Sequence, residues 1–408
     1  MGSLKAQSDV NSIYSRFGIG DLNDQRMSAQ TGLGGLSIGL RMPNTINMVN
    51  PASYTAIDTL SFLFDVGVMG KYTRYEASAM NTDHYHANFD HLNILFPVIQ
   101  KRWASSFGLM PYSRTGYDVS TLGVPQPVIG VVDVYHKGSG NISELYWGHA
   151  FQYKWLSLGM NASFLFGNLD KINTVQYPID DQAINTISTR SLTVRGFKVN
   201  FGLQAEKIFQ GQHQVILGLT YAPAMKVGAY TSHLVEVGYS GAELADTLTY
   251  TESDRLHLKV PESMGVGLSY GYRKQWLVGV DYSTQRWQSG NVLTSDTLRN
   301  AHKFSAGIQF IPRNQETTAI STYFQRMHYR IGFSYATSYL QIQGHQPYES
   351  VFTAGLGLPS GSDRTLFNIS YQYGTRGTNN GNLVKENFHI LSFGVTLHDY
   401  WFIRRRFR

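Results

Sequence analysis

The chain is dominated by stretches in which apolar and polar residues alternate with a period of two. In residues 60–75, Phe62, Phe64 and Val66 share one face, whereas Asp65 lies on the other. Successive side chains of a β-strand point to opposite faces, so this alternation predicts strands. About fourteen such stretches are separated in turn by long polar segments and by tight connections. This rhythm predicts an antiparallel sheet with long loops at one end and short turns at the other.

The expected strands cover residues 60–75, 88–99, 103–117, 142–153, 155–168, 188–209, 212–232, 257–272, 275–290, 299–313, 324–342, 347–359, 364–376 and 385–402. Long loops are expected at residues 76–87, 118–141, 169–187, 233–256, 291–298 and 377–384. Tight turns are expected at Gln100-Lys101-Arg102, Tyr153-Lys154, Gln210-Gly211-Gln212 and Arg273-Lys274-Gln275. The gaps at 314–323 and 343–346 break the rhythm, the first by being too long and the second by being too short.

Charged residues within these stretches lie on the polar faces, as Lys198, Asp281 and Arg330 do. A charge on the lipid-facing side of a barrel costs roughly 2–4 kcal/mol at mid-bilayer, so the charged faces must line a lumen. A water-soluble sandwich would place the apolar faces inside instead. The pattern predicts an all-β fold, a transmembrane antiparallel barrel of about 14 strands over residues 60–402, located in the bacterial outer membrane.

Residues 7–59 lack sustained alternation and are rich in Gly, Ser and Asn. Irregular backbone can fold inside a barrel because the wall shields it from lipid. Apolar residues spread through the segment favour packing there over a disordered periplasmic tail. We therefore expect an N-terminal hatch in the lumen. Residues 1–6 are interpreted as the end of a signal peptide or a segment added for expression, and residues 403–408 as a basic periplasmic tail.

Composition agrees with a membrane barrel and limits the chemistry. Aromatic residues make up 13% of the chain and include 26 Tyr, which suits girdles at both membrane interfaces. Cysteine is absent, which permits any compartment. The net charge of +6 includes Arg404-Arg405-Arg406, which suits lipid headgroups and carries no nucleic-acid motif. We expect no cofactor and no metal, because the His/Asp-rich residues 83–91 are more typical of a surface loop.

Several motifs together resemble one family. They are Asn50-Pro51-Ala52, Gly108 with Pro111 to Tyr117, Val260-Pro261-Glu262-Ser263, Gly265 to Tyr270, Trp276, Asp281-Tyr282 and Trp287. In this order they resemble the FadL/TodX-type outer-membrane transporters of hydrophobic compounds, whose hatch closes with an Asn-Pro-Ala run before the first strand. The resemblance covers nearly the whole chain. The PorV-type shuttle proteins of type IX secretion share this fold.

The resemblance implies a route in which loops capture a hydrophobic molecule, a pocket above the hatch holds it, and a gap in the wall releases it sideways. Inward residues that could form the pocket are Phe17, Ile19, Met110, Tyr112 and Arg114. Arg114 could pair with a ligand carboxylate or with an acid of the protein.

A lateral gap needs a strand that breaks its hydrogen-bond ladder. Pro111 lacks a backbone donor, and Gly108 and Gly116 lie nearby, so the third strand is the candidate for a kink. The alternative is a harmless proline near the outer end of the strand.

Lumenal charges are expected to anchor the hatch, because buried charges require partners. The candidates are Asp65, Lys198, Glu206, Asp281 and Arg330 on the strands, with Arg16, Asp21, Asp24, Arg26 and Arg41 in the hatch.

Two functions follow. The first is uptake of small, fatty-acid-like hydrophobic molecules through the plugged barrel, with surrounding outer-membrane lipid as the other contact. The alternative is a non-transporting accessory or shuttle barrel that binds other outer-membrane proteins in a secretion or assembly complex. No set of residues suggests an enzyme.

Overall fold

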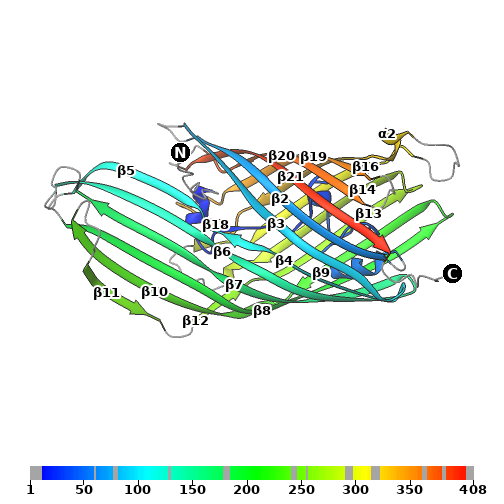
Figure 1. The fold of residues 1–408 in the computed structure, drawn as a ribbon, viewed down its shortest axis with the longest axis horizontal. Coiled ribbons are helices and arrows are strands. Elements are labelled where there is room, and N and C mark those ends of the chain that lie inside the picture. The colour runs from blue at the N-terminus through cyan, green and yellow to red at the C-terminus, as the bar shows by residue number, and fades with distance from the viewer. Residues whose placement is uncertain are drawn as a thin grey trace, which may run out of the picture.

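The computed structural model describes residues 12–400 apart from 59–60, 77–80, 127–129, 178–183, 240–245, 254–255, 290–296, 314–321, 361–364 and 379–382. Fourteen antiparallel strands close into a barrel (Figure 1). In order around the wall they are β2 (Ser61–Glu76), β3 (Asn81–Ile99), β4 (Trp103–Arg114), β6 (Gly130–Tyr153), β7 (Leu156–Gln176), β8 (Ile184–Phe209), β9 (His213–Ala222), β13 (Glu262–Tyr272), β14 (Trp276–Arg286), β16 (Ala301–Phe310), β17 (His328–Thr337), β19 (Tyr348–Pro359), β20 (Leu366–Arg376) and β21 (Lys385–Tyr400). The barrel closes where β2 pairs with β21.

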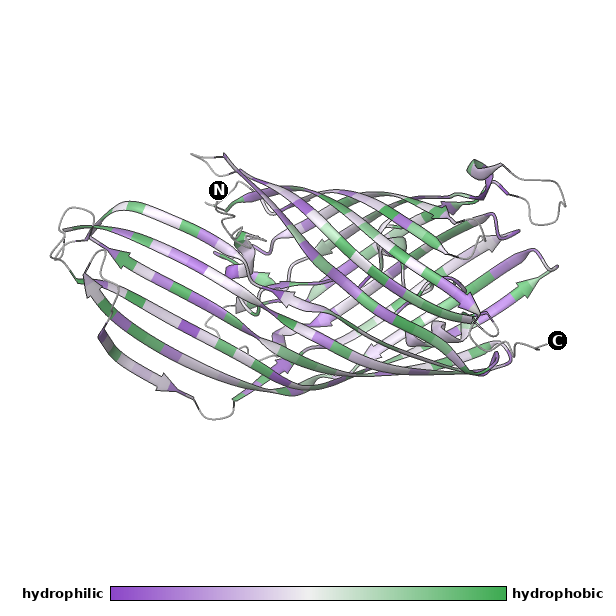
Figure 2. Ribbon diagram, in the orientation of Figure 1, coloured by the Kyte–Doolittle hydropathy of each residue, from purple (hydrophilic) through white to green (hydrophobic). Residues whose placement is uncertain are grey.

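The barrel carries its apolar side chains outside and its charges inside. Phe197, Val280 and Phe352 are exposed on the outer wall, whereas Asp281 and Arg330 are only 5% and 3% exposed. Figure 2 shows the resulting alternation of hydrophobic and hydrophilic residues along the strands. The expected polarity of a membrane barrel is therefore confirmed. None of the helices within the described residues has the length and apolar character needed to cross a membrane.

The expected tight turns lie at one end of the barrel. Lys101, Lys154, Gln210 and Arg273 each have a positive φ between 50° and 56°. Connections of two or three residues between twisted antiparallel strands use such left-handed backbone, which explains why polar residues and Gly211 occupy them. These turns confirm the short-turn half of the predicted rhythm.

Four of the six long loops expected at the other end were predicted wrongly, whereas a large part of 291–298 and of 377–384 lies outside the described residues. Much of 76–87, 118–141, 169–187 and 233–256 is strand. Strands β6, β7 and β8 run past the barrel, and β5 (Tyr117–Gln126), β10 (Met225–Tyr239), β11 (Asp246–Glu252) and β12 (Leu256–Val260) complete a sheet that projects from it, at the left of Figure 1. Outside the bilayer neither face of a strand has to be apolar, so these strands need not carry the sustained alternation that marks the others.

The predicted strand 324–342 also needs correction. It begins as a helical turn, α2 (Tyr323–Arg326), continues as β17, and ends as β18 (Leu340–Gln341). The short strand β15 (Thr297–Leu298) pairs with β18, and η3 (Trp287–Ser289) follows β14.

The N-terminal segment, residues 12–58, lies within the barrel, drawn in blue in Figure 1. It contains η1 (Ile13–Arg16), β1 (Asp21–Leu22), α1 (Ser28–Thr31) and η2 (Pro51–Ala56). The segment runs from the loop end of the barrel, where Ser12 contacts the start of β21, to the turn end, where Ser61 pairs with Tyr400. Residues 1–11, 59 and 401–408 lie outside the described residues, so the outer limits of the expected hatch and tails stay predictions.

Candidate functional site: the lumen and its N-terminal segment

Arg41 fastens the second half of the N-terminal segment to the wall. Its Nε is 3.0 Å from Glu206 Oε2 of β8, and its Nη2 donates to Gln152 of β6 at 2.8 Å. The same guanidinium donates to Ala52 O and to Thr55 Oγ1 within the segment. A planar fork of five donors can serve several acceptors at once, which a lysine could not do. The predicted pairing of Glu206 with a hatch cation is present here.

Asp281 of β14 holds the middle of the segment, and no cation among the residues that the structure describes forms an ion pair with it. Three successive backbone N–H groups, those of Ser37, Ile38 and Gly39, donate to its carboxylate at 2.6, 2.7 and 3.1 Å. Consecutive N–H groups that converge on one anion form a nest, a fixed site of partial positive charge. The carboxylate is therefore balanced by backbone dipoles, which residue types alone do not reveal.

The Asn50-Pro51-Ala52 motif begins a helical turn that packs on the barrel wall. Asn50 caps η2 by accepting a hydrogen bond from Ala52 N at 3.2 Å, and Pro51 occupies the first turn, where no backbone donor is needed. The Asn50 amide also donates to Ile38 O at 2.7 Å. Tyr54 of the same turn donates to Asn161 of β7. The motif positions a turn against β7 and β8 and ties it to the nest.

An ionic cluster fastens the first part of the segment to β19, β20 and β21. Arg376 lies 2.9 Å from Asp21 Oδ1 and 2.5 Å from Glu349 Oε2. Glu386 accepts from Ser12 Oγ at 2.6 Å. Burial and then the Glu386 carboxylate raise the pKa of Tyr14, so its hydroxyl stays protonated and donates to Val384 O.

Sequence reasoning missed Arg376, Glu349 and Glu386. All three are charged residues within predicted strands, and that signal could have identified them.

A second ionic contact joins the segment to β16. Lys303 pairs with Asp24, which also lies 3.3 Å from Arg26. Burial acts to raise the pKa of Asp24, but Lys303 and Arg26 outweigh it and hold the pKa below its usual value. The Asp24 carboxylate therefore stays charged inside the barrel.

The other predicted anchors have partners within the wall, which corrects the expectation for them. His91 bridges Asp65 and Asp90 at 2.6 and 2.8 Å. Lys198 pairs with Glu144, and Arg330 donates to Gln309 and Asn368. By contrast, Arg16 of the N-terminal segment does reach the wall, where its Nη2 lies 3.3 Å from His136 Nε2 of β6. Inward side chains on the same, adjacent or next-but-one strands are within reach of each other around the wall, so they can satisfy one another without the N-terminal segment.

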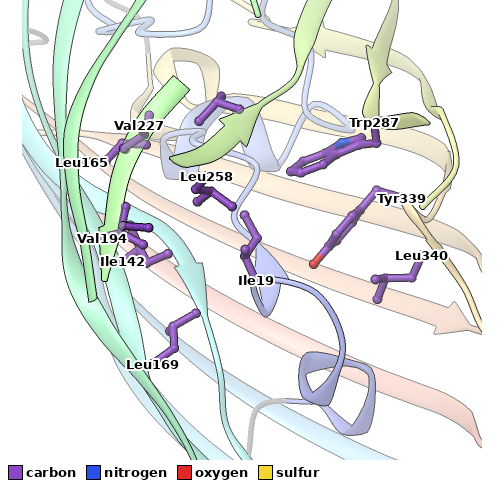
Figure 3. Packing of buried hydrophobic residues seen from close by; sticks show 12 residues of the cluster. Ile19, Ile142, Leu165, Leu169, Val194, Val227, Leu258, Trp287, Tyr339 and Leu340 are labelled. Carbon is purple, nitrogen blue, oxygen red and sulfur yellow. The ribbon is translucent and has the colours of Figure 1, made fainter. Parts of the chain in front are cut away.

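The five predicted pocket residues do not form one pocket. Phe17, Ile19 and Tyr112 pack in one cluster; Figure 3 shows Ile19 between Leu258 on one side and Tyr339 on the other. Met110 belongs to a separate cluster near the Asn50 motif. The Arg114 guanidinium donates to Phe89 O.

A cavity of about 430 Å³ remains in the lumen. Tyr112 and Arg114 line it. So do the charged residues Asp21, Asp24, Arg26, Lys71, Asp90, Lys198, Lys303, Glu349 and Arg376. Apolar residues such as Met48, Met69 and Val260 also line it, so its wall combines ionic and apolar groups.

The wall is irregular between β3 and β4. Their pairing ends at Leu92 and Leu109, although both strands continue. The extra residue Asp90 in β3 marks a bulge against β2, and a register shift follows Pro111 in β4. Gly108 lies at the end of the shared ladder, and Gly116 lies in the break between β4 and β5.

The N-terminal segment covers the freed edge of β4. Asp21 pairs with Arg114 and Leu22 with Ser113, and Asn23 N donates to Tyr112 O at 2.9 Å. The backbone groups of β4 that β3 leaves unpaired are therefore satisfied from inside the barrel.

Solved structures with the same fold are outer-membrane channels at low sequence identity. The toluene transporter TbuX of Ralstonia pickettii has a TM-score of 0.63 and 13% identity, covering 91% of this chain and 97% of its own. The toluene transporter TodX of P. putida has a TM-score of 0.62 and 12% identity, covering 93% and 99%. The monoaromatic hydrocarbon channel CymD has a TM-score of 0.59 and 13% identity, covering 92% and 98%.

These similarities establish a FadL-like barrel fold and no more. No curated protein is significantly similar in sequence. The BamG family model matches residues 1–408, the whole length of the sequence, and the chain therefore belongs to the BamG family.

Proposed function

We propose that this protein is a non-transporting accessory barrel of an outer-membrane assembly or secretion complex, located in the bacterial outer membrane. The observation that carries the proposal is the way the lumen is filled. Side chains or backbone of β4, β6, β7, β8, β13, β14, β16, β19, β20 and β21 hold residues 12–58. A through-route would require many of these contacts to break together.

Energetic arguments support the same proposal. Removing one partner of a buried ion pair costs about 3–5 kcal/mol. The pairs Arg41–Glu206 and Arg376–Asp21 would each meet that cost if the segment moved away. In addition, an apolar molecule gains about 25 cal/mol per Å² only where it meets apolar surface. The lining of the remaining cavity mixes charged residues with apolar ones such as Met48, Met69 and Val260, so it is not the continuous apolar surface that such a molecule requires.

A second candidate, uptake of small hydrophobic molecules with lateral release, is favoured by the interrupted ladder between β3 and β4. In this alternative β1 would leave the edge of β4 and open a path from the lumen to the bilayer. The residues Phe17, Ile19, Met110, Tyr112 and Arg114 would then be ligand contacts, and Gly108, Pro111 and Gly116 the gate.

Purification from the native membrane in mild detergent, followed by mass spectrometry of proteins and small molecules, separates the two. The accessory role predicts a stoichiometric outer-membrane protein partner and no hydrophobic compound retained in the lumen. A retained fatty acid or hydrocarbon at about one per barrel, with no partner protein, would overturn it in favour of uptake.

A further inference from the structure

The sheet that projects beyond the barrel ends on one side in the hairpin formed by β10 and β11. We call this sheet the extension sheet; it comprises β5, residues 130–138 of β6, 168–176 of β7 and 184–195 of β8, together with β10 and β11. Strand β11 lies at its margin, at the lower left of Figure 1. Among the residues that the structure describes, β10 is the one strand that pairs with β11, so the opposite edge of β11 is free.

The free edge of β11 presents backbone groups that have no strand to pair with. Ser253 N donates to Thr231 O at 2.8 Å, which directs this N–H group toward β10. The N–H groups of successive residues point to alternate sides of a strand, so those of Glu252 and Tyr250 point away from β10. An edge of this kind accepts an extended segment through main-chain hydrogen bonds.

The sequence of β11 does not protect this edge. Natural sheets blunt free edges with proline, lysine, bulges or a covering segment. The other margin of the extension sheet follows that rule, because β5 contains Pro125 and also Gly123, which has a positive φ. Strand β11 contains neither proline nor lysine, and all seven of its residues are exposed. Its pairing with β10 shifts register at Leu248 and continues without a shift from Thr249 to Glu252, so this part of the edge is open to a partner.

The hairpin is acidic, although the whole chain has a net charge of +6. Residues 227–254 contain five acidic residues and neither lysine nor arginine. Three of these acids lie in the described strands, namely Glu236 on β10 and Asp246 and Glu252 at the two ends of β11. None of the three forms an ion pair with a residue that the structure describes. A segment that pairs with this edge is therefore stabilised by positive charges near its ends.

The same charges argue against other occupants of the edge. Asp246 and Glu252 stand at opposite ends of an extended strand, roughly 20 Å apart, so they cannot hold one metal ion between them. Anionic headgroups at a membrane surface would be repelled by the hairpin. A second copy of this chain is disfavoured as well. Antiparallel pairing of two β11 strands about Thr249 sets Asp246 of one copy opposite Glu252 of the other, and like charges in opposite positions destabilise a strand pair.

We infer that the free edge of β11 binds an extended, basic segment of a partner protein outside the membrane. The segment adds as a further strand and accepts hydrogen bonds from the N–H groups of Tyr250 and Glu252. Its lysine or arginine side chains lie near Asp246 and Glu252. This inference rests on the proposed accessory function and specifies the chemistry of the partner. The ionic part of the binding weakens with salt, because the acids are exposed.

The first test compares charge variants of the full-length barrel in detergent. Asp246→Asn with Glu252→Gln removes two acids from the edge of β11. Asp58→Asn with Asp118→Asn removes two exposed acids from other surfaces and changes the net charge equally. The probe is a fluorescein-labelled peptide with lysine at both ends and alternating threonine and valine between them. Fluorescence anisotropy measures its binding at several salt concentrations.

The edge variant should bind the peptide about five- to tenfold more weakly, because two exposed ion pairs are lost. The control variant should bind it as the unchanged protein does. Equal weakening in both variants, no weakening in either, or no binding by the unchanged protein would overturn the inference. So would equal binding of a peptide with glutamate at both ends.

A second pair of variants tests the addition of a strand. Tyr250→Pro removes an N–H group that points to the free edge, whereas Tyr250→Ala removes the same side chain and keeps that donor. Proline is tolerated in an edge strand where its missing donor faces solvent, so the pairing with β10 is retained. The proline variant should bind the peptide about tenfold more weakly than the alanine variant. Equal binding by the two would overturn strand addition. Self-association of the unchanged protein that Tyr250→Pro abolishes would overturn the inference in favour of a second copy.

Native purification of the edge variant and its control separates this inference from the function on which it rests. Loss of the partner protein from the edge variant alone supports both. A partner retained equally by both variants refutes the edge of β11 as its site and leaves the accessory role standing. If no partner co-purifies with the unchanged protein, the accessory role fails, and peptide binding still decides the chemistry of the edge.

Discussion

Replacing Asp281 by Asn should loosen the N-terminal segment without disturbing the barrel. The carboxylate accepts three backbone N–H groups and is 5% exposed, so little water can replace it. Hydrogen bonds to a charged acceptor contribute about 1.5–3 kcal/mol each. An amide has one acceptor oxygen and places its own donors against the nest. We expect the local opening free energy of Ser37 to Gly39 to fall by about 3–5 kcal/mol.

Hydrogen–deuterium exchange of the detergent-solubilised protein measures this change. Each 1.4 kcal/mol corresponds to a factor of ten, so exchange at residues 37–39 should accelerate about 150- to 4000-fold. Asp65→Asn is the matched control, because Asp65 is 3% exposed and, within the described part of the chain, bonds to the barrel residues His91 and Thr396. Acceleration below tenfold, or an equal effect of Asp65→Asn on the same amides, would refute the nest as the main anchor.

Three further changes test the site. Arg41→Lys keeps the positive charge but removes the planar guanidinium that serves several acceptors at once. Peptides covering residues 52–55 should therefore exchange deuterium faster, while the barrel still shows heat-modifiable migration on gels. Unchanged exchange would contradict the role of Arg41. Asn50→Ala removes the helix cap of η2 and should lower the free energy of unfolding by about 1 kcal/mol, seen as a lower midpoint of thermal unfolding. An unchanged midpoint would show that the cap does not contribute to stability. Leu22→Cys with Ser113→Cys, paired residues in a chain without cysteine, should form a disulfide that fixes β1 to β4. The accessory function predicts that partner binding survives this cross-link, whereas uptake with lateral release predicts that oxidation blocks cargo entry and reduction restores it.

The strands of the barrel could be predicted because the bilayer imposes a simple rule on each of them. Phe197 and Val199 must face lipid while Lys198 between them must not, so a short window of sequence carries the signal. The tight turns were predictable for a similar local reason, since Lys101 and Arg273 occupy positions that need left-handed backbone in a hairpin.

The extension sheet could not be predicted in this way. Strands such as β11 have both faces in water, so neither side is required to be apolar, and Leu248 and Tyr250 alternate with threonines over only a few residues. Pairing with β10 across a distant part of the chain makes this segment a strand. Whether this segment forms a loop or a strand depends on its pairing with β10, and the local sequence does not specify that partner.

The sequence by itself determined the barrel, the placement of apolar side chains outside and polar ones inside, and the presence of an irregular segment before the first strand. These features follow from whether each side chain is exposed to lipid or to water. Only the tertiary structure decided which charges meet across the lumen. Asp281 is balanced by the backbone of Ser37 to Gly39, Arg376 by Asp21, and Asp65 by the neighbouring His91. Each of these contacts depends on the register of strands around a closed wall and on the path of a chain threaded through it, and neither is encoded in the period of any single strand.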